Sequence, residues 1–321
     1  MSANPRPILV ITGPTGIGKT DLSMALSEQF PIRLLSADSV MVYQHLDIGS
    51  AKPAAEKLSR SPHELIDLVP PEHAFDAGQF VTHATEAIKR TWDSNLVPCL
   101  VGGTIMYLKS LLDGLDPLPS SDPIIRAKIR KKADHEGWPA VHAWLESLDS
   151  GAAQMIHPNH SSRIERALEV RLITGDSICS FWSKRKTDQR IAGHPVEVAT
   201  LALMPNNREQ LKNRLDRRFD AMLTEGLEAE VRSLKERPAL SLTCTSMRSV
   251  GYRQMWEFLD GDISKNEMRD RAKAATRQLA KRQMTWLRSW RADTKTIIEV
   301  GGALPIGKAK NWLSGEIDRV L

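Results

Sequence analysis

One short segment near the start of the sequence constrains the fold more than any other. Residues 8–12 read ILVIT, an apolar run typical of a strand buried on both faces. The next eight residues read GPTGIGKT and match the phosphate-binding pattern G-x-x-x-x-G-K-[ST], and apolar residues recur at helical spacing from Lys19 onward. Strand, glycine-rich turn and helix in this order predict an anion site made of backbone N–H groups and a helix N-terminus, with Lys19 on the terminal phosphate and Thr20 holding Mg²⁺. The residues expected to bind phosphate are Gly13, Pro14, Thr15, Gly16, Ile17, Gly18, Lys19 and Thr20.

Further strand-like runs place this loop at the edge of a parallel sheet. Apolar runs at residues 32–36, 96–101 and 196–203 alternate with helix-like segments, which predicts right-handed crossovers between parallel strands. Ligands of such folds bind beyond the carboxyl ends of the strands. The strand ends therefore bring residues 13–20, 37–39 and 102–104 to one edge, and the fold class is α/β.

The pattern changes in the middle of the chain. Strand signals fade between about residues 120 and 199, and helical segments at 122–135 and 162–173 dominate. We expect an α/β core with C-terminal helices from residues 1–120 and 200–321, and an inserted, mostly helical domain from residues 121–199.

Composition narrows the class of protein. Three cysteines stand far apart without a C-x-x-C pair, so a disulfide framework or zinc finger is not supported, and a reducing cytoplasm fits best. No signal peptide or run of about 18 apolar residues is present, so a membrane span is not expected. The net charge is only +5, but residues 269–291 hold eight Lys or Arg against one acid, which makes this segment +7 and the remainder −2. Such a concentrated basic segment indicates a polyanionic partner.

An acidic residue at the sheet edge is expected to do the chemistry. The apolar run that continues to Gly102-Gly103-Thr104 ends without a carboxylate, which disfavours hydrolases and switches that need one to hold Mg²⁺ and activate water. Asp38 instead follows the second strand, where it can accept a proton from a substrate beside the bound phosphates. The alternative is a helix-capping or turn-forming Asp.

At this level of detail the sequence resembles the tRNA dimethylallyltransferases, also called isopentenyl-tRNA transferases, in their bacterial form. The matching motifs run collinearly from residue 11 to about 290: GPTGIGKT, Asp38-Ser39, Asp47-Ile-Gly-Ser-Ala-Lys-Pro53, Val101-Gly-Gly-Thr104, Arg163-x-x-Arg166-Ala-Leu-Glu, Arg214 with Arg218, Val250-Gly-Tyr-Arg-Gln254 and Thr276 to Gln283 with Trp286. Many members carry Gln and Thr where this chain has Met41 and Ser50.

The resemblance implies a phosphate-loop NTPase-like core and a specific reaction. The family moves a dimethylallyl group from dimethylallyl diphosphate to the exocyclic amine of the adenosine 3′-adjacent to the anticodon, releasing diphosphate. Lys19, Thr104, Arg218 and Mg²⁺ are then expected to stabilise the leaving diphosphate, and Asp38 to act as the base. The phosphate-loop pattern is also that of ATP-binding proteins, and the sequence leaves open whether a nucleotide occupies the loop.

The resemblance also implies contacts with the anticodon stem-loop of tRNA, including contacts from the inserted domain. These contacts are assigned to Asp38, Ser39, Val40, Met41, Thr104, Arg126, Ser162, Arg163, Ile164, Glu165, Arg166, Arg248, Ser249, Val250, Gly251, Tyr252, Arg253, Lys281, Arg282, Gln283, Trp286 and Arg288.

Local patterns give some of these residues a structural alternative. Ser162-x-x-Glu165 fits a capping box, which favours a structural Glu165, and Arg163 and Arg166 are equally compatible with surface salt bridges. Trp286 shares a helical stripe with other large residues, which favours the core over base stacking. Tyr107 is also expected in the core.

Two other functions remain open on the residues alone. A small-molecule or nucleoside kinase would share the loop and an Asp acting on a hydroxyl. A nucleotide-dependent RNA-binding switch would share the loop and the basic segment but has no need of Asp38 as a base. A monomer is the default oligomeric state.

Overall fold

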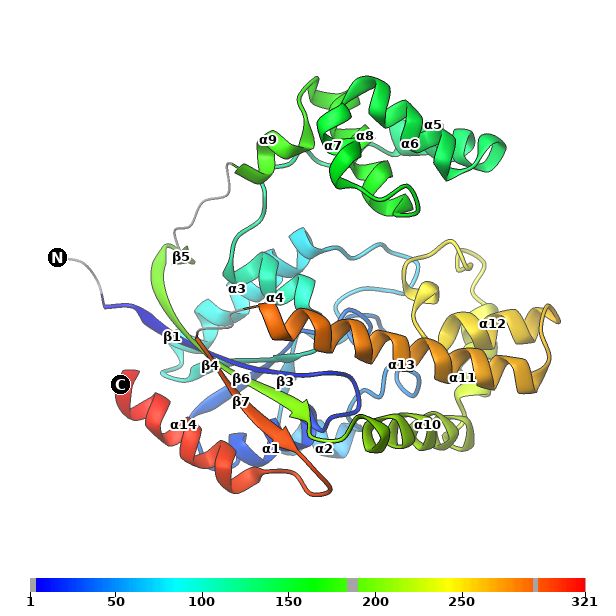
Figure 1. Cartoon of the computed structure of the whole chain (residues 1–321). Helices are drawn as coiled ribbons and strands as arrows, with labels where there is room; N and C mark the ends of the chain where they lie inside the picture. The colour runs from blue at the N-terminus through cyan, green and yellow to red at the C-terminus, as the bar shows by residue number, and fades with distance from the viewer. Residues whose placement is uncertain (1–3, 184–189, 291–293, 321) are drawn as a thin grey trace. The chain divides into compact units, whose positions relative to one another are not determined.

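The computed structural model describes residues 4–183, 190–290 and 294–320. It divides into two compact units, one formed by Met1–Leu112 with Gln189–Leu321 and the other by Asp113–Asp188 (Figure 1). The expected limits of the insertion, 121–199, differ from these because strand β6 (His194–Pro205) pairs with β1 (Arg6–Thr12) from Val196 onward. Residues 194–199 therefore belong to the sheet of the first unit.

The first unit is built on a seven-stranded sheet, which confirms the α/β fold. Its order is β3-β2-β4-β1-β6-β5, and β7 also pairs with β6. Every pairing is parallel except that of β5 with β6. The remaining strands are β2 (Ile32–Ser36), β3 (His63–Glu64), β4 (Val97–Gly102), β5 (Arg190–Ile191) and β7 (Lys295–Val300). The sequence did not predict the two-residue β3 and β5, nor β7.

Alternate residues of the central strand face two separate cores. Ile8 and Val10 of β1 belong to one cluster, whereas Leu9 and Ile11 belong to the other. Helices α3 (Ala77–Asp93) and α4 (Ile105–Leu112) pack in the first cluster, and α1 (Lys19–Ser27) and α14 (Ile306–Val320) in the second (Figure 1). A short helix, α2 (Ala55–Arg60), has no buried residue. The sheet is therefore covered on both faces, as a parallel sheet requires.

Four helices after β6 complete the first unit and surround the carboxyl edge of the sheet. They are α10 (Arg208–Glu225), α11 (Leu227–Lys235), α12 (Tyr252–Asp260) and α13 (Lys265–Ser289), with a 3₁₀ helix at Ser246–Arg248. The longest, α13, begins where the Ser264 hydroxyl accepts the Glu267 N–H, and it packs against α10 and α12.

The second unit is a small helical domain with its own core. It contains α5 (Pro123–Glu136), α6 (Trp138–Leu148), α7 (Ser150–Met155), α8 (Ser161–Thr174) and α9 (Ile178–Ser183). Its centre is apolar, with Ile129, Val141 and Leu168 fully buried. The predicted capping box is wrong, because the cap of α8 is His160 and Ser162 already lies inside the helix.

None of the helices in the described parts of the chain is both long and apolar enough to span a bilayer.

Candidate active site

The predicted phosphate-binding loop forms at the end of β1. Gly16 and Gly18 have φ angles of 72° and 102°, a region that favours glycine. Helix α1 begins at Lys19, so its N-terminus points toward the loop. The Lys19 ammonium group donates to the carbonyls of Gly13 at 3.0 Å and Pro14 at 2.9 Å. The loop therefore folds as the sequence predicts, with its lysine held across the turn.

A cavity of about 680 Å³ opens beside this loop and is rich in cations. We call it the phosphate cavity; Lys19, Thr20, Lys52, Lys57, Arg214 and Arg218 are among its lining residues. Lys52 is neutralised by Asp47 and Asp67, whereas Arg218 forms no hydrogen bond or ion pair with any described residue. Burial lowers the pKa of Lys19 to about 8, opposed by Asp38 and assisted by Arg218. Burial likewise lowers the pKa of Arg218. Partly buried cations without a carboxylate in hydrogen-bond contact are suited to an anionic ligand.

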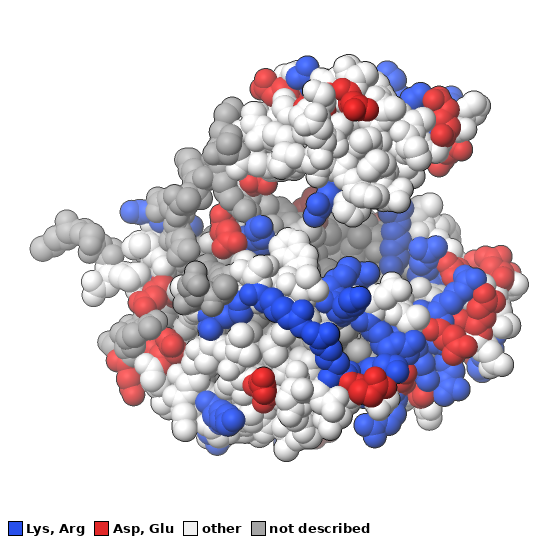
Figure 2. All heavy atoms as spheres, viewed as in Figure 1, with Lys and Arg blue, Asp and Glu red and all other residues white. Residues whose placement is uncertain are grey.

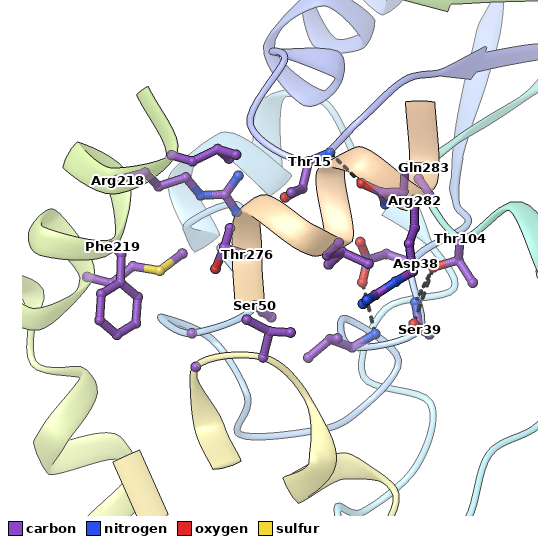
Figure 3. Close-up of a pocket in the computed structure, with 18 of the residues that line it drawn as sticks. Thr15, Asp38, Ser39, Ser50, Thr104, Arg218, Phe219, Thr276, Arg282 and Gln283 are labelled. Carbon is purple, nitrogen blue, oxygen red and sulfur yellow. Dashed lines mark hydrogen bonds between the residues drawn. The ribbon is translucent and has the colours of Figure 1, made fainter. Parts of the chain in front are cut away.

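A second cavity of about 370 Å³ adjoins the first and has an apolar wall. We call it the apolar cavity; Phe219, Met222, Leu227, Val250, Leu279 and Trp286 contribute to that wall. Thr15, Asp38, Ser50 and Arg218 line both cavities and define a junction between them. Figure 3 shows that these residues come from the phosphate loop, the segment after β2, the turn that holds Ser50 and helix α10, and that Thr276 and Arg282 of α13 lie close by. The junction is where the cationic cavity adjoins the apolar one.

Asp38 serves the turn with one oxygen and leaves the other available. Its Oδ1 accepts the N–H of Val40 at 2.9 Å and the N–H of Met41 at 3.4 Å, so the turn-forming alternative is correct for this atom. Its Oδ2 forms no hydrogen bond within the described chain. The carboxylate is thus oriented by the backbone and retains an acceptor at the junction.

Thr104 organises the same turn from the end of β4. Its hydroxyl accepts the Ser39 N–H at 3.0 Å and donates to the Ser39 hydroxyl at 3.2 Å. The hydroxyl proton expected to reach a phosphate oxygen is therefore engaged by Ser39 in this structure.

Gln283 joins the phosphate loop to the β4 end. Its Oε1 accepts the Thr15 N–H at 2.8 Å, and its Nε2 donates to the Gly103 carbonyl at 2.9 Å. A Cβ atom at Gly103 would lie 2.6 Å from that nitrogen, so only glycine admits the approach. The side chain predicted to bind tRNA is instead engaged in positioning two strand ends.

The basic segment of α13 has two unlike halves. Toward its N-terminal end, Arg269 and Lys273 pair with Asp220 and Arg277 pairs with Asp216. Toward its C-terminal end, Lys281, Arg282 and Arg288 are exposed and form no ion pair with described residues. Figure 2 shows basic side chains along this helix, mixed with acidic ones toward its N-terminal end. Arg291, which the sequence analysis counted in this segment, lies outside the described residues.

Trp286 lies on the surface beside these free cations. It is 44% exposed, so the predicted core position is wrong, although Tyr107 is buried as expected. The Lys109 ammonium group lies 5.3 Å from the centre of the Trp286 ring. Residues 281, 282, 285 and 286 also line a shallow depression that shares Arg282 and Trp286 with the apolar cavity. The predicted stripe of Leu279, Gln283 and Trp286 lines the apolar cavity, whereas the buried residues of this part of α13 are Ala280, Met284 and Leu287.

In the helical domain, most predicted contacts have structural partners. Arg126 and Arg166 both bind the fully buried Glu169, and Glu165 pairs with Arg130. Ile164 is fully buried, so the prediction that its side chain contacts tRNA is wrong. Arg163 is exposed and has no ion pair in the described part of the domain.

The predicted tRNA contacts at residues 248–253 also differ in their surroundings. Val250 and Gly251 line the apolar cavity, and Arg248 is exposed. Tyr252 is fully buried, so the predicted tRNA contact is wrong for its side chain. Arg253 pairs with Glu257.

Some lining residues had no assigned role at the sequence level. Arg214 was quoted only with Arg218, Met222 lies four residues beyond Arg218, and Ser50 was noted only as a position where many family members carry Thr. Their helical spacing from Arg218 would have placed Arg214 and Met222 on the same face of α10.

Comparisons with known proteins agree with this geometry. A family profile described as IPP transferase matches residues 41–290. A curated relative, tRNA dimethylallyltransferase 2 of Hahella chejuensis, is 46% identical over 293 residues, with 88% of each chain covered. The full-length tRNA isopentenylpyrophosphate transferase of Bacillus halodurans has a similar structure, with a TM-score of 0.70 at 30% identity over 99% of this chain and 98% of that chain. A eukaryotic dimethylallyltransferase acting on tRNA has a TM-score of 0.77 at 24% identity, covering 97% of this chain and 77% of that one, which is a likeness of fold.

Proposed function

The chain belongs to the IPP transferase family, and from this premise we propose that it moves a dimethylallyl group from dimethylallyl diphosphate to tRNA. The acceptor is the exocyclic amine of the adenosine 3′-adjacent to the anticodon, and diphosphate is released. The observation that carries the proposal is the junction, where Asp38 and Arg218 line both a cationic cavity and an apolar one.

The phosphate cavity suits the diphosphate of the donor. The loop N–H groups, Lys19 and Arg218 supply positive charge where negative charge grows as the carbon–oxygen bond breaks. Mg²⁺ also fits, because it prefers oxygen ligands and binds through phosphates plus one or two protein groups. Thr20 lines the cavity and would hold the ion, which would neutralise charge on the diphosphate when bound. The apolar wall near Phe219 and Met222 suits the five-carbon chain.

Asp38 is the proposed base. The adenine amine is a weak nucleophile because its lone pair is delocalised into the ring, so proton removal must accompany formation of the carbon–nitrogen bond. The free Oδ2 of Asp38 accepts that proton, while Oδ1 keeps the carboxylate fixed on the Val40 and Met41 N–H groups. The leaving diphosphate takes the bonding electron pair of the broken bond.

The unpaired basic residues of α13 support the RNA half of the proposal. The reactive base must leave its stack to reach the junction, which costs a few kcal/mol. Contacts between phosphates and Lys281, Arg282 and Arg288 offset this cost. The exposed Trp286 ring provides a surface for a neighbouring base.

The enzyme is proposed to act as a cytoplasmic monomer. Its three cysteines are free, which suits a reducing compartment.

The acceptor assignment is tested with two synthetic anticodon stem-loops that differ at one atom group. One carries adenosine 3′ of the anticodon and the other carries inosine, which has no exocyclic amine. With dimethylallyl diphosphate and Mg²⁺, mass spectrometry is expected to find one added dimethylallyl group on the first RNA and none on the second. Equal modification of both RNAs would place the transfer on another atom.

A further inference from the structure

A turn at the junction is held by a carboxylate from another part of the chain. Three successive N–H groups of this turn donate to Glu230 of α11: those of Asp47 at 3.1 Å and Ile48 at 2.7 Å bind Oε2, and that of Gly49 at 3.2 Å binds Oε1. Consecutive N–H groups converging on one anion form a nest, which fixes the backbone around the charge.

Tyr252 extends this arrangement by one residue. Its hydroxyl donates to Glu230 Oε1 at 2.6 Å and accepts the Ser50 N–H at 3.2 Å. Burial and the Glu230 carboxylate raise the pKa of Tyr252, so the hydroxyl keeps its proton for this donation. Glu230 and Tyr252 together satisfy four backbone donors in a row, at residues 47–50. We call these two side chains the turn clasp.

The turn also packs tightly on the tyrosine ring. A Cβ atom at Gly49 would lie 2.6 Å from Cε2 and Cζ of Tyr252 and 2.9 Å from Leu227 Cδ1. The Ser50 hydroxyl bonds the carbonyls of Leu46 at 2.6 Å and Asp47 at 3.1 Å. The turn therefore has one well-defined position against the clasp.

That position matters because of what the turn faces. Gly49 lines the apolar cavity, and Ser50 is one of the four residues that line both cavities. The other three are Thr15 of the phosphate loop, the proposed base Asp38, and Arg218, which forms no ion pair with a described residue. Ser50 is thus part of the wall of the junction, together with the groups proposed to do the chemistry.

We propose that Glu230 and Tyr252 are positioning residues for the transfer reaction, holding Gly49 and Ser50 as the fixed wall of the junction. The proposal rests on the proposed function. A wall displaced by a fraction of an ångström misaligns donor carbon and acceptor amine, and misalignment slows the transfer step more than it weakens binding. Tyr252 acts here through the turn, which accounts for its burial away from solvent.

The test is a single-turnover measurement on Tyr252→Phe and Glu230→Gln. Phe keeps the ring that packs on Gly49 and removes only the hydroxyl. Gln keeps the shape of Glu but places an N–H₂ group among N–H donors. We expect the transfer rate constant to fall about tenfold for Tyr252→Phe and about thirtyfold for Glu230→Gln, with donor and RNA dissociation constants within about threefold of wild type.

The amplitude of the turnover separates positioning from folding. A purely structural role would lower the fraction of active enzyme, and hence the amplitude, and leave the rate constant of the remaining active sites unchanged. That result would overturn the proposal. Glu228→Gln is the matched control on the same helix, because Glu228 pairs with the side chains of Arg232 and Lys265 rather than with the turn. It is expected to match wild type.

The double variant gives an independent check. If the Tyr252 hydroxyl and the Glu230 carboxylate hold the turn together, the double variant should lose less rate than the product of the two single losses. Full multiplicativity would show that the two side chains act separately and would overturn the shared role. Failure of the proposed function is distinguishable, because wild type itself would then transfer nothing.

Discussion

The cations of the phosphate cavity and those of the helical domain were both predicted from the sequence to be functional, but their surroundings differ. Lys19 and Arg218 are partly buried and have no carboxylate in hydrogen-bond contact within the described residues. Arg126 and Arg166 bind Glu169, which also accepts the Asp122 N–H at 2.8 Å. Burial alone would raise the pKa of Glu169, but these hydrogen bonds lower it below its usual value.

The cations of the phosphate cavity are available to a ligand, whereas those of the helical domain stabilise the fold. A partly buried cation without an anionic partner is unfavourable for the free protein and becomes favourable when an anion binds. A buried carboxylate between two arginines ties α5, α8 and the segment before α5 together. Substitutions in the first region should therefore change catalysis, and substitutions in the second should change stability.

The largest expected effect is on the proposed base. Asp38→Asn keeps the turn acceptor at Oδ1 and removes the proton acceptor, so single-turnover transfer should slow by about 10²- to 10⁴-fold. RNA binding, measured by fluorescence anisotropy, should survive. A rate near that of wild type would remove Asp38 from the mechanism.

The second-largest effect is expected for Lys19, the cation of the phosphate loop. Lys19→Ala is expected to lower kcat/KM for the donor by about 10²- to 10³-fold, because both binding and departure of diphosphate lose a charge. Unchanged turnover at saturating donor would contradict the role of the loop.

In the helical domain the corresponding change should act on folding. Glu169→Gln leaves two arginines without their anion and should lower the free energy of unfolding by about 3 kcal/mol, measured by urea denaturation. Because the pKa of Glu169 is lowered in the fold, its contribution is present at neutral pH and is lost as the pH falls through that value. Glu136→Gln, at an exposed pair with Lys132, is the control and should leave the urea midpoint unchanged. Equal effects of the two substitutions would contradict the conclusion that the buried Glu169 ion pairs stabilise the helical domain.

The two halves of α13 offer the same contrast within one helix. Replacing Lys281 and Arg282 by Ala should weaken stem-loop binding about tenfold at low salt and reduce the slope of log Kd against log salt by about 1.4. Replacing Arg269 and Arg271, which pair with Asp220 and Glu267, should do much less. Equal losses would mean that ion pairing does not mark the RNA-binding half.

The smallest expected effect is on pH dependence. The Lys19 pKa of about 8 means that the free enzyme loses this charge as the pH rises above 8. Between pH 8 and 9, diphosphate binding to wild type should weaken several-fold relative to Lys19→Arg, whose guanidinium stays charged. Parallel titration calorimetry curves for the two proteins would contradict a lowered lysine pKa.

The sequence predicted the core of the site because its determinants are local. Strand β1, the glycine turn and helix α1 are adjacent in the chain, and β2 and β4 are short, mostly apolar runs typical of a buried parallel sheet. Asp38 and Thr104 follow directly from the ends of those strands. Strand β7 was missed because its exposed and buried residues are mixed, which removes the apolar run that identified the other strands.

The partners of the site could not be predicted in the same way. Glu230 lies 181 to 183 positions from the N–H groups it binds, and Gln283 lies 268 positions from Thr15. The residues around Glu230 and Gln283 do not predict these partners, because a helix has the same hydrophobic pattern whichever element packs against it. Trp286 shows a different error: a helical stripe of large residues identifies a shared face, but that face lines a cavity here and not the core.

The central claim is that the phosphate loop binds a departing prenyl diphosphate and not a nucleotide that is consumed. It is tested most directly by measuring diphosphate and alkylated RNA together, with wild-type enzyme, Mg²⁺ and either dimethylallyl diphosphate or ATP. The account predicts one diphosphate for each dimethylallyl group transferred, and only when the prenyl donor and the stem-loop are both present. A phosphorylated product formed from ATP, or a stem-loop left unalkylated by the prenyl donor, would contradict it.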